Sequence, residues 1–159
     1  MKQITEYLST KVSQTKIKAT DKTIKQIVKD ELDRLGHDAD LNHIDTSEVT
    51  NMVCLFNCHK AYLGLKYKDL NPDISKWDVS NVKDMDFMFF ACNNFNCDIS
   101  GWDVKKVENM NCMFLECERF NQDLSQWDVR NVNEIYQMFD GCPIKEEYKP
   151  HFVNYGTIL

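Results

Sequence analysis

The chain has 159 residues, is 43% hydrophobic and 28% charged, and carries a formal net charge of −6 at pH 7. This balance is typical of one globular domain with a sizeable core, and it excludes an intrinsically disordered chain. Because an acidic chain without a cluster of Lys and Arg lacks the phosphate contacts of a nucleic-acid binder, we expect no nucleic-acid partner.

Residues 1–18 form a polar N-terminal segment without the apolar run or cleavage site of a secretory signal. No stretch reaches the ~18 apolar residues of a membrane span. The seven Cys are an odd number, which favours reduced thiols and a cytoplasmic protein. Residues 1–8 resemble the start of many proteins from gut Bacteroidales and their phages. In the alternative that this resemblance implies, residues 1–18 dock a virion-associated structural or cargo component into a larger assembly.

An amphipathic helix is predicted after Thr23. Its apolar stripe has helical spacing and comprises Ile24, Ile27, Val28, Leu32 and Leu35. Gly36 is a typical C-terminal stop. Because the first unit of a repeat array exposes its core unless another element covers it, we interpret residues 19–43 as a helical cap.

The main signal is an internal repeat. The triplet Trp-Asp-Val begins at Trp77, Trp102 and Trp127, with a step of 25 residues. A degenerate unit begins near Ile44, 33 residues before the next one, and carries an insertion around residues 61–69. We assign the repeat array to residues 44–142, with units that start near 44, 77, 102 and 127. Residues 143–159 are interpreted as a C-terminal cap.

Each unit is expected to form a strand, a turn and a short helix. Ile99, Trp102 and Val104 show the alternating pattern of a half-buried strand. The apolar residues between 82 and 89 have the spacing of one helical face. The predicted fold class is therefore an α/β solenoid: a leucine-rich-repeat-like array of about four strand–turn–short-helix coils with a parallel sheet, plus the N-terminal helical cap.

The repeated pattern F-N-x-D-(I/L)-S-x-W-D-V-x-x-V-x-x-M-x-x-M-F-x-x-C resembles the BspA-like leucine-rich repeats of bacterial and mycoplasma surface proteins. The resemblance covers residues 44–142. It implies a curved solenoid with a parallel sheet on one face and a binding role. It also implies the alternative that the protein is a cell-surface adhesin or antigen.

Positions that are identical between units are expected to serve the fold. These structural columns comprise Trp77, Trp102, Trp127, Asn96, Asn121, Phe89, Phe114 and Phe139. An exposed, ligand-binding Trp stripe remains an alternative to packing. The two Asp columns, from Asp73 and from Asp78, are expected to accept turn N–H groups rather than bind Ca²⁺.

Positions that vary between units are free to bind a partner. On the expected strand face these positions and their neighbours are Lys76, Gly101, Gln126, Ser75, Ser100 and Ser125. The insertion adds Tyr62, Leu63 and Tyr67 as interface candidates, unless this loop only completes the cap.

Motifs of catalysis, such as G-x-S-x-G and H-E-x-x-H, are absent from the sequence. We therefore expect a non-enzymatic protein–protein interaction module without cofactor or metal. A zinc site at Cys54, Cys58 and His59 stays open as an alternative, because C-x₃-C-H without a second ligand pair is a weak signal.

Overall fold

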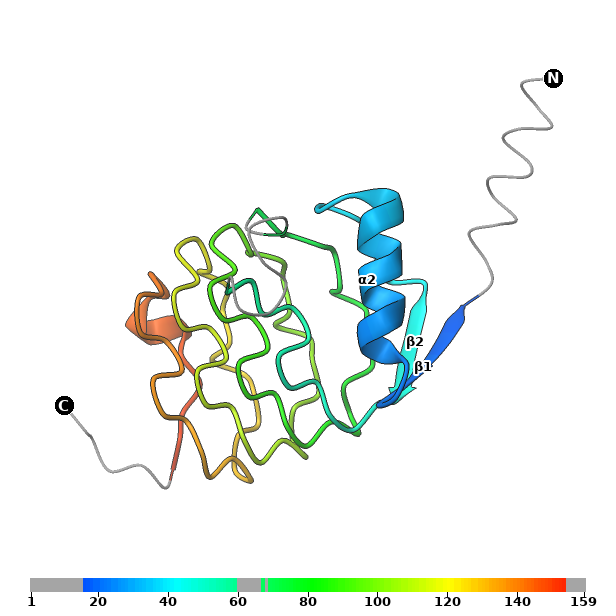
Figure 1. The fold of residues 1–159 in the computed structure, drawn as a ribbon. Coiled ribbons are helices and arrows are strands. Elements are labelled where there is room, and N and C mark those ends of the chain that lie inside the picture. The colour runs from blue at the N-terminus through cyan, green and yellow to red at the C-terminus, as the bar shows by residue number, and fades with distance from the viewer. Residues whose placement is uncertain (1–15, 60–66, 68, 154–159) are drawn as a thin grey trace, which may run out of the picture.

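The computed structural model describes residues 16–59, 67 and 69–153. Its elements, in chain order, are β1 (Ile17–Thr20), α2 (Ile24–Leu35), β2 (Ile44–Glu48) and the 3₁₀ helix η2 (Glu146–Tyr148). The helix α2 and the two strands lie at one end of a row of stacked loops, and η2 lies at the opposite end (Figure 1).

The helix α2 occupies the stretch whose apolar stripe predicts a helix. Ile24, Val28 and Leu32 on this stripe are buried. Gly36 ends the helix with a φ of 98°, and its N–H donates to the Leu32 carbonyl at 2.9 Å. A positive φ is accessible to glycine because it has no Cβ. The stop signal in the sequence thus has a direct structural cause.

The two strands form a small parallel sheet that joins the N-terminal region to the repeats. Ile17 pairs with Ile44 and Lys18 pairs with Asp45. Leu41, just before β2, donates its N–H to the Asp73 carbonyl at 2.9 Å. These bonds connect the N-terminal region to the first of the 25-residue units.

The predicted α/β solenoid is wrong. Within the described residues, the structure contains only two parallel strands and a single α-helix, and no solenoid of four strand–turn–short-helix coils is seen. Between residues 49 and 142 the described chain forms turns and isolated parallel bridges, which pair Asn51 with Asp84, Asp84 with Asn109, and Asn109 with Glu134.

Left-handed residues explain why the predicted short helices do not form. Phe87 has a φ of 53° and Ala91 has a φ of 59°, and an α-helix of L-residues cannot pass through such positions. Five of the equivalent positions in the other units are also left-handed: Cys54, Cys112, Glu116, Gln137 and Gly141. The apolar spacing correctly marks Met85 and Phe89 as buried, but this spacing fits stacked turns as well as a helix.

Hydrogen bonds show what replaces the helices. The N–H groups of Met85, Phe87, Phe89 and Ala91 donate to carbonyls of the next unit at 2.9–3.0 Å. The intervening N–H groups of residues 88, 90 and 92 close local turns by donating three residues back. We call this arrangement the turn ladder, and its segments are residues 52–58, 85–92, 110–117 and 135–142. Every N–H from 87 to 92 is therefore paired, which a buried backbone requires.

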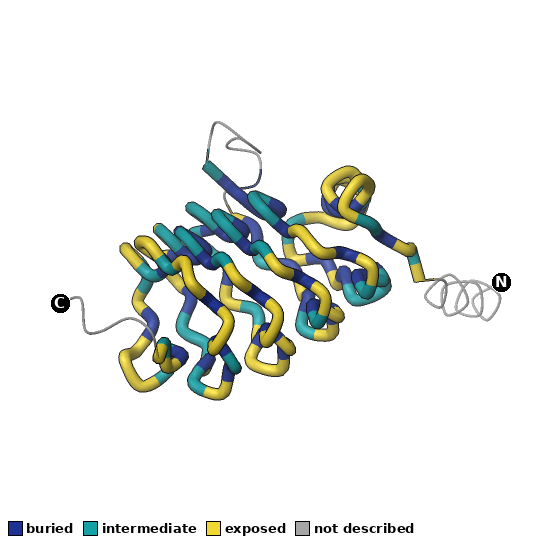
Figure 2. Tube along the Cα trace, turned by 90° about the horizontal axis from the view of Figure 1, so that it is seen from below, coloured by how far each residue is buried: buried dark blue, intermediate teal, exposed yellow. Residues whose placement is uncertain are grey.

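The columns of residues that are identical between units form the core between the stacked loops. Trp77, Trp102 and Trp127 are only 4–5% exposed. The Trp102 and Trp127 indoles donate to the carbonyls of Ile74 and Ile99 at 3.3 and 3.2 Å. The outward corners of each loop carry the exposed residues (Figure 2). The Trp residues therefore pack and do not form an exposed stripe.

Stacked Phe rings and Asn side chains connect the units. Consecutive rings from Phe56 through Phe89 and Phe114 to Phe139 lie 5.5–5.6 Å apart and within 11° of parallel. In the Asn column, Asn96 N donates to Asn71 Oδ1 at 2.9 Å, and Asn121 N donates to Asn96 Oδ1 at 3.0 Å. At the C-terminal end, Leu124 N donates to the Tyr148 carbonyl at 2.8 Å, and Phe152 packs against the core.

Candidate functional site

The binding column expected on a strand face lies instead on exposed turns. Lys76, Gly101 and Gln126 are all exposed. The neighbouring serines Ser75, Ser100 and Ser125 donate their N–H groups to Asp73, Asp98 and Asp123 at 3.0 Å. Hydrogen bonds from the serines lower the pKa of these carboxyl groups. The Asp column therefore stabilises turns, and the varying side chains beside it are small or flexible.

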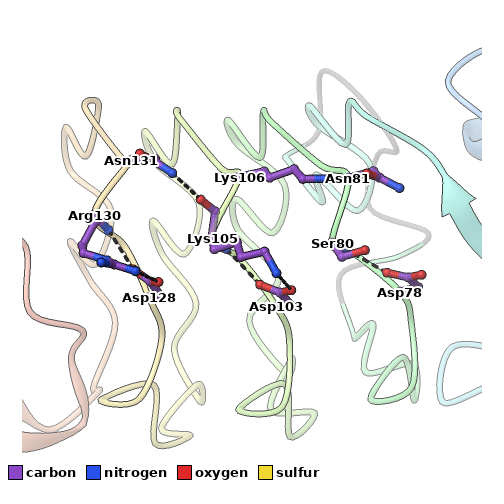
Figure 3. A network of polar contacts seen from close by, with 9 residues as sticks. All are labelled: Asp78, Ser80, Asn81, Asp103, Lys105, Lys106, Asp128, Arg130 and Asn131. Atoms are coloured by element: carbon purple, nitrogen blue, oxygen red, sulfur yellow. Dashed lines mark hydrogen bonds and ion pairs between the residues drawn. The ribbon is translucent and has the colours of Figure 1, made fainter.

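The second Asp column shapes the next corner of each loop (Figure 3). Asp103 pairs with Lys105 at 2.7 Å, and Asp128 pairs with Arg130 at 2.7 Å. The hydrogen bond from Arg130 lowers the pKa of Asp128 to about 2. The other polar groups of this corner bind neighbouring units, as where Asn131 Nδ2 donates to the Lys105 carbonyl at 2.6 Å. Many polar groups at this corner are therefore paired within the chain.

The insertion presents one described candidate, and that residue is buried. Tyr67 is 3% exposed, its hydroxyl donates to Asp33 Oδ1 at 2.6 Å, and its ring lies 5.5 Å from that of His37. Tyr67 therefore packs against the α2 region and does not face a partner. Tyr62 and Leu63 lie outside the described residues.

Three of the cysteines pack in the core. Cys58, Cys92 and Cys117 are buried, and the Cys58 and Cys92 Sγ atoms lie 3.0 Å apart. Burial raises the thiol pKa of Cys92 and Cys117 well above its usual value. His59 stacks on Phe90, with ring centroids 5.2 Å apart. Among the described residues, no three His, Cys, Asp or Glu side chains form a metal-binding group.

A surface that the sequence analysis missed lies on the outer side of the turn ladder. Phe87 and Phe90 are half-buried and meet edge to face at 5.7 Å. Leu115, in the next unit, occupies the position of Phe90 and is also half-buried. Tyr136, in the last unit, is 70% exposed. We call the outward positions of the turn ladder, which vary from unit to unit, the ladder face. Its apolar members include Phe87, Phe90, Leu115 and Tyr136.

A carboxyl group with a raised pKa lies on the same face. Asp86 Oδ1 is buried and has no hydrogen-bond partner in the described part of the chain. Burial, with the nearby charges of Asp84 and Glu134, raises the pKa of Asp86 to about 6. Tyr136 and Asn111 occupy the positions of Asp86 in later units. The sequence shows that this position varies among the units. The predicted short helices, however, did not place Asp86, Asn111 and Tyr136 on one exposed face.

A hollow of about 980 Å³ continues the ladder face at the C-terminal end of the stack. Its walls include Ile135, Tyr136 and Phe139 from the last unit, and Lys149 and Phe152 from the segment beyond it. Polar and apolar groups are therefore both available to a ligand at this end.

The comparisons with known proteins identify a family but assign no activity. The family described as Mycoplasma protein of unknown function, DUF285, matches residues 22–150. No curated protein and no solved structure matches the chain. Among the described residues, each helix is too short or too polar to cross a lipid bilayer.

Proposed function

We propose that this chain, which belongs to the family of Mycoplasma proteins of unknown function that matches it, is a non-enzymatic module that recognises another protein. The binding surface in this proposal is the ladder face. The observation that carries it is a set of partly exposed apolar side chains whose own backbone N–H groups are paired: Phe87, Phe90, Leu115 and Tyr136.

The chemistry of these side chains fits an interface. Aromatic side chains dominate the energetics of protein interfaces because they bury a large area with few rotatable bonds. The hydrogen-bonded turn ladder holds Phe87 and Phe90 in place before binding, and such preorganisation lowers the entropy cost of association. The paired charges at the Asp128 corner offer less, because exposed ion pairs contribute little binding energy.

The backbone at Phe87 supports the same interpretation. A left-handed conformation costs an L-residue about 1–2 kcal/mol, and Asn or Gly adopts it more easily. Phe87 nevertheless occupies such a position, with a φ of 53°. Because Cys54, Cys112 and Gln137 share this conformation, the turn ladder requires it, and the feature specific to Phe87 is the partly exposed aromatic ring at that position.

The thiol chemistry supports the non-enzymatic part of the proposal. A nucleophilic cysteine needs a lowered pKa, whereas burial raises the pKa of Cys92, Cys97, Cys112, Cys117 and Cys142. Asp86, the carboxyl with the raised pKa, lies near Cys112 and raises the pKa of that thiol further.

The test compares two exposed faces of the same protein. Phe87→Asn removes the aromatic ring while keeping a residue that tolerates the left-handed conformation, and Gln126→Asn is the matched change on the Ser-Asp turns. The tagged full chain and both variants are used to capture partners from the native source, with quantitative mass spectrometry. We expect Phe87→Asn to lower recovery of the main partner at least about tenfold, which corresponds to one buried aromatic contact, and Gln126→Asn to retain it.

The opposite pattern, with loss only in Gln126→Asn, would place binding on the Ser-Asp turns and refute the role of the ladder face. Equal recovery by all three proteins would refute it as well. Circular dichroism and thermal unfolding of each variant verify that any loss of binding does not come from loss of the fold.

A further inference from the structure

The turn ladder has a direction, because every backbone N–H to carbonyl bond that its segments donate to a neighbouring unit runs toward the C-terminal end of the stack. In segment 110–117, the N–H groups of Met110, Cys112, Phe114 and Glu116 donate to carbonyls of the last unit at 2.8–2.9 Å. The carbonyls that receive them belong to Glu134, Tyr136, Met138 and Asp140. The carbonyls of the last unit that face the preceding unit therefore already accept hydrogen bonds.

The backbone N–H groups of segment 135–142 that face away from the preceding unit have no next unit to which they can donate. By the register of the repeat, they are the N–H groups of Ile135, Gln137, Phe139 and Gly141. None of them donates a hydrogen bond within residues 16–59, 67 and 69–153. The stack consequently ends in a row of backbone donors, comparable to the open edge of a sheet, which is a template for another chain.

The stacked rings end at the same edge. One face of Phe139 lies on Phe114 at 5.6 Å and 2°, and the ring is only partly buried. The Lys149 ammonium approaches this ring at 5.9 Å from its centroid. The hollow of about 980 Å³ lies against this ring and against most of the donor segment. An incoming segment would thus find backbone donors and an aromatic surface together.

We propose that this edge binds a basic segment of another protein, which adopts the turn conformation of the turn ladder and adds its backbone as one more unit. Its carbonyls accept hydrogen bonds from Ile135, Gln137, Phe139 and Gly141, and one of its aromatic side chains stacks on Phe139. The comparable addition of a peptide backbone to an open sheet edge is an established mode of recognition, with the main chain providing affinity and side chains providing specificity.

The charges beside the edge favour a basic occupant. Glu134 and Asp140 immediately precede the first and last donors, and both line the hollow. The Lys149 charge is paired with Glu146 at 2.6 Å. The carboxylates therefore outweigh the cations around the donors, and Lys or Arg side chains complement them.

A second copy of the chain is a poor occupant. Two C-terminal edges would bring donors against donors, which cannot form hydrogen bonds. At the other end of the turn ladder, Met52 and Phe56 are 0% exposed, so the first ring is already covered and cannot stack on Phe139 of another copy. This inference uses backbone donors at the end of the stack and does not depend on the proposed role of Phe87 and Phe90.

The probe for the test is a peptide with the sequence of residues 109–117 that carries Cys112→Ser, Glu116→Lys and Cys117→Ser. In the full chain this segment accepts the hydrogen bonds of the preceding unit and stacks Phe114 on Phe89. Amide hydrogen exchange of the full chain is followed by NMR with and without the peptide. The amides of 110, 112, 114 and 116 are internal controls, because they are paired in the chain.

We expect the amides of Ile135, Gln137, Phe139 and Gly141 to exchange faster than these controls in the free chain, and at least about tenfold more slowly with saturating peptide. A peptide with Phe114→Ala should bind about tenfold more weakly. Asp140→Lys in the protein should also weaken binding, and because Asp140 is exposed, this variant should retain the fold.

Equal protection of the edge amides and their controls in the free chain would overturn the inference, as would peptide-induced changes confined to other amides. A concentration-dependent dimer that protects the edge amides would overturn the choice of occupant. The Phe87→Asn variant is expected to bind the peptide normally, so failure at the edge and failure at the ladder face are distinguishable.

Discussion

Gly141 provides the sharpest test of the turn ladder, because a helix and a left-handed turn predict opposite effects of the same substitution. Gly141 has a φ of 70°, and a Cβ added there would lie 3.4 Å from Glu116 Cα. An L-residue in this conformation loses about 1–2 kcal/mol relative to glycine. The reduced freedom of the unfolded chain returns about 0.4–1 kcal/mol. We therefore expect Gly141→Ala to lower the free energy of unfolding by about 1 kcal/mol.

Gly101 is the matched control. It is exposed, its φ lies outside the left-handed region, and an added Cβ would meet no atom within 4 Å. Gly101→Ala should therefore raise the free energy of unfolding by about 0.4–1 kcal/mol, through the unfolded state alone. Urea unfolding followed by circular dichroism measures both changes. Thermal unfolding should show a decrease in Tm of about 2–4 °C for Gly141→Ala.

If residues 135–142 formed the short helix that their apolar spacing predicts, Gly141→Ala would instead stabilise the protein by up to about 1 kcal/mol. A stabilising Gly141→Ala, similar to Gly101→Ala, would therefore refute the left-handed turn and the hydrogen-bonding pattern derived from it. An unchanged dependence of the free energy on urea concentration in both variants verifies that the comparison concerns the folded state.

Three further predictions concern buried polar groups. Because the pKa of Asp86 is raised to about 6, its ionised form destabilises the fold above that pH, so Asp86→Asn should raise the urea midpoint at pH 7 but not at pH 4. Tyr67→Phe removes the hydrogen bond to the Asp33 carboxylate and should cost about 1.5–3 kcal/mol in urea unfolding. Cys92 is fully buried with a raised pKa, so alkylation at pH 7 followed by mass spectrometry should label half-buried Cys54 well before Cys92.

Each of these three has a contrary result that would count against the structure. Equal midpoint shifts of Asp86→Asn at both pH values would show that Asp86 is not held in a partly buried, unpaired state. A neutral Tyr67→Phe would show that Tyr67 is not anchored on α2 through Asp33. Labelling of Cys92 as fast as Cys54 in the folded protein would show that the Cys column is accessible.

The sequence alone determined the period, the buried positions and the chemistry of the turns. Copies in register identified the columns of Trp102 and Phe114 as structural, because a side chain that packs between units must recur at each step. Asp98 followed by Ser100 is a local turn signal, and its hydrogen bond needs only neighbouring residues. The helix α2 was equally readable, since its stripe and Gly36 act within one segment.

Only the tertiary structure decided the conformation of the segments around Met85 and Phe89. Their apolar spacing fits both a helix and a turn ladder, because both place these side chains on one buried face. The N–H of Phe87 distinguishes the two, since it donates to the Asn111 carbonyl of the next unit rather than to a carbonyl within its own segment. That acceptor lies 24 residues further along the chain and is within reach only when the units stack. The conformation, the ladder face and the open donor edge therefore follow from contacts between units, which no single segment of the sequence contains.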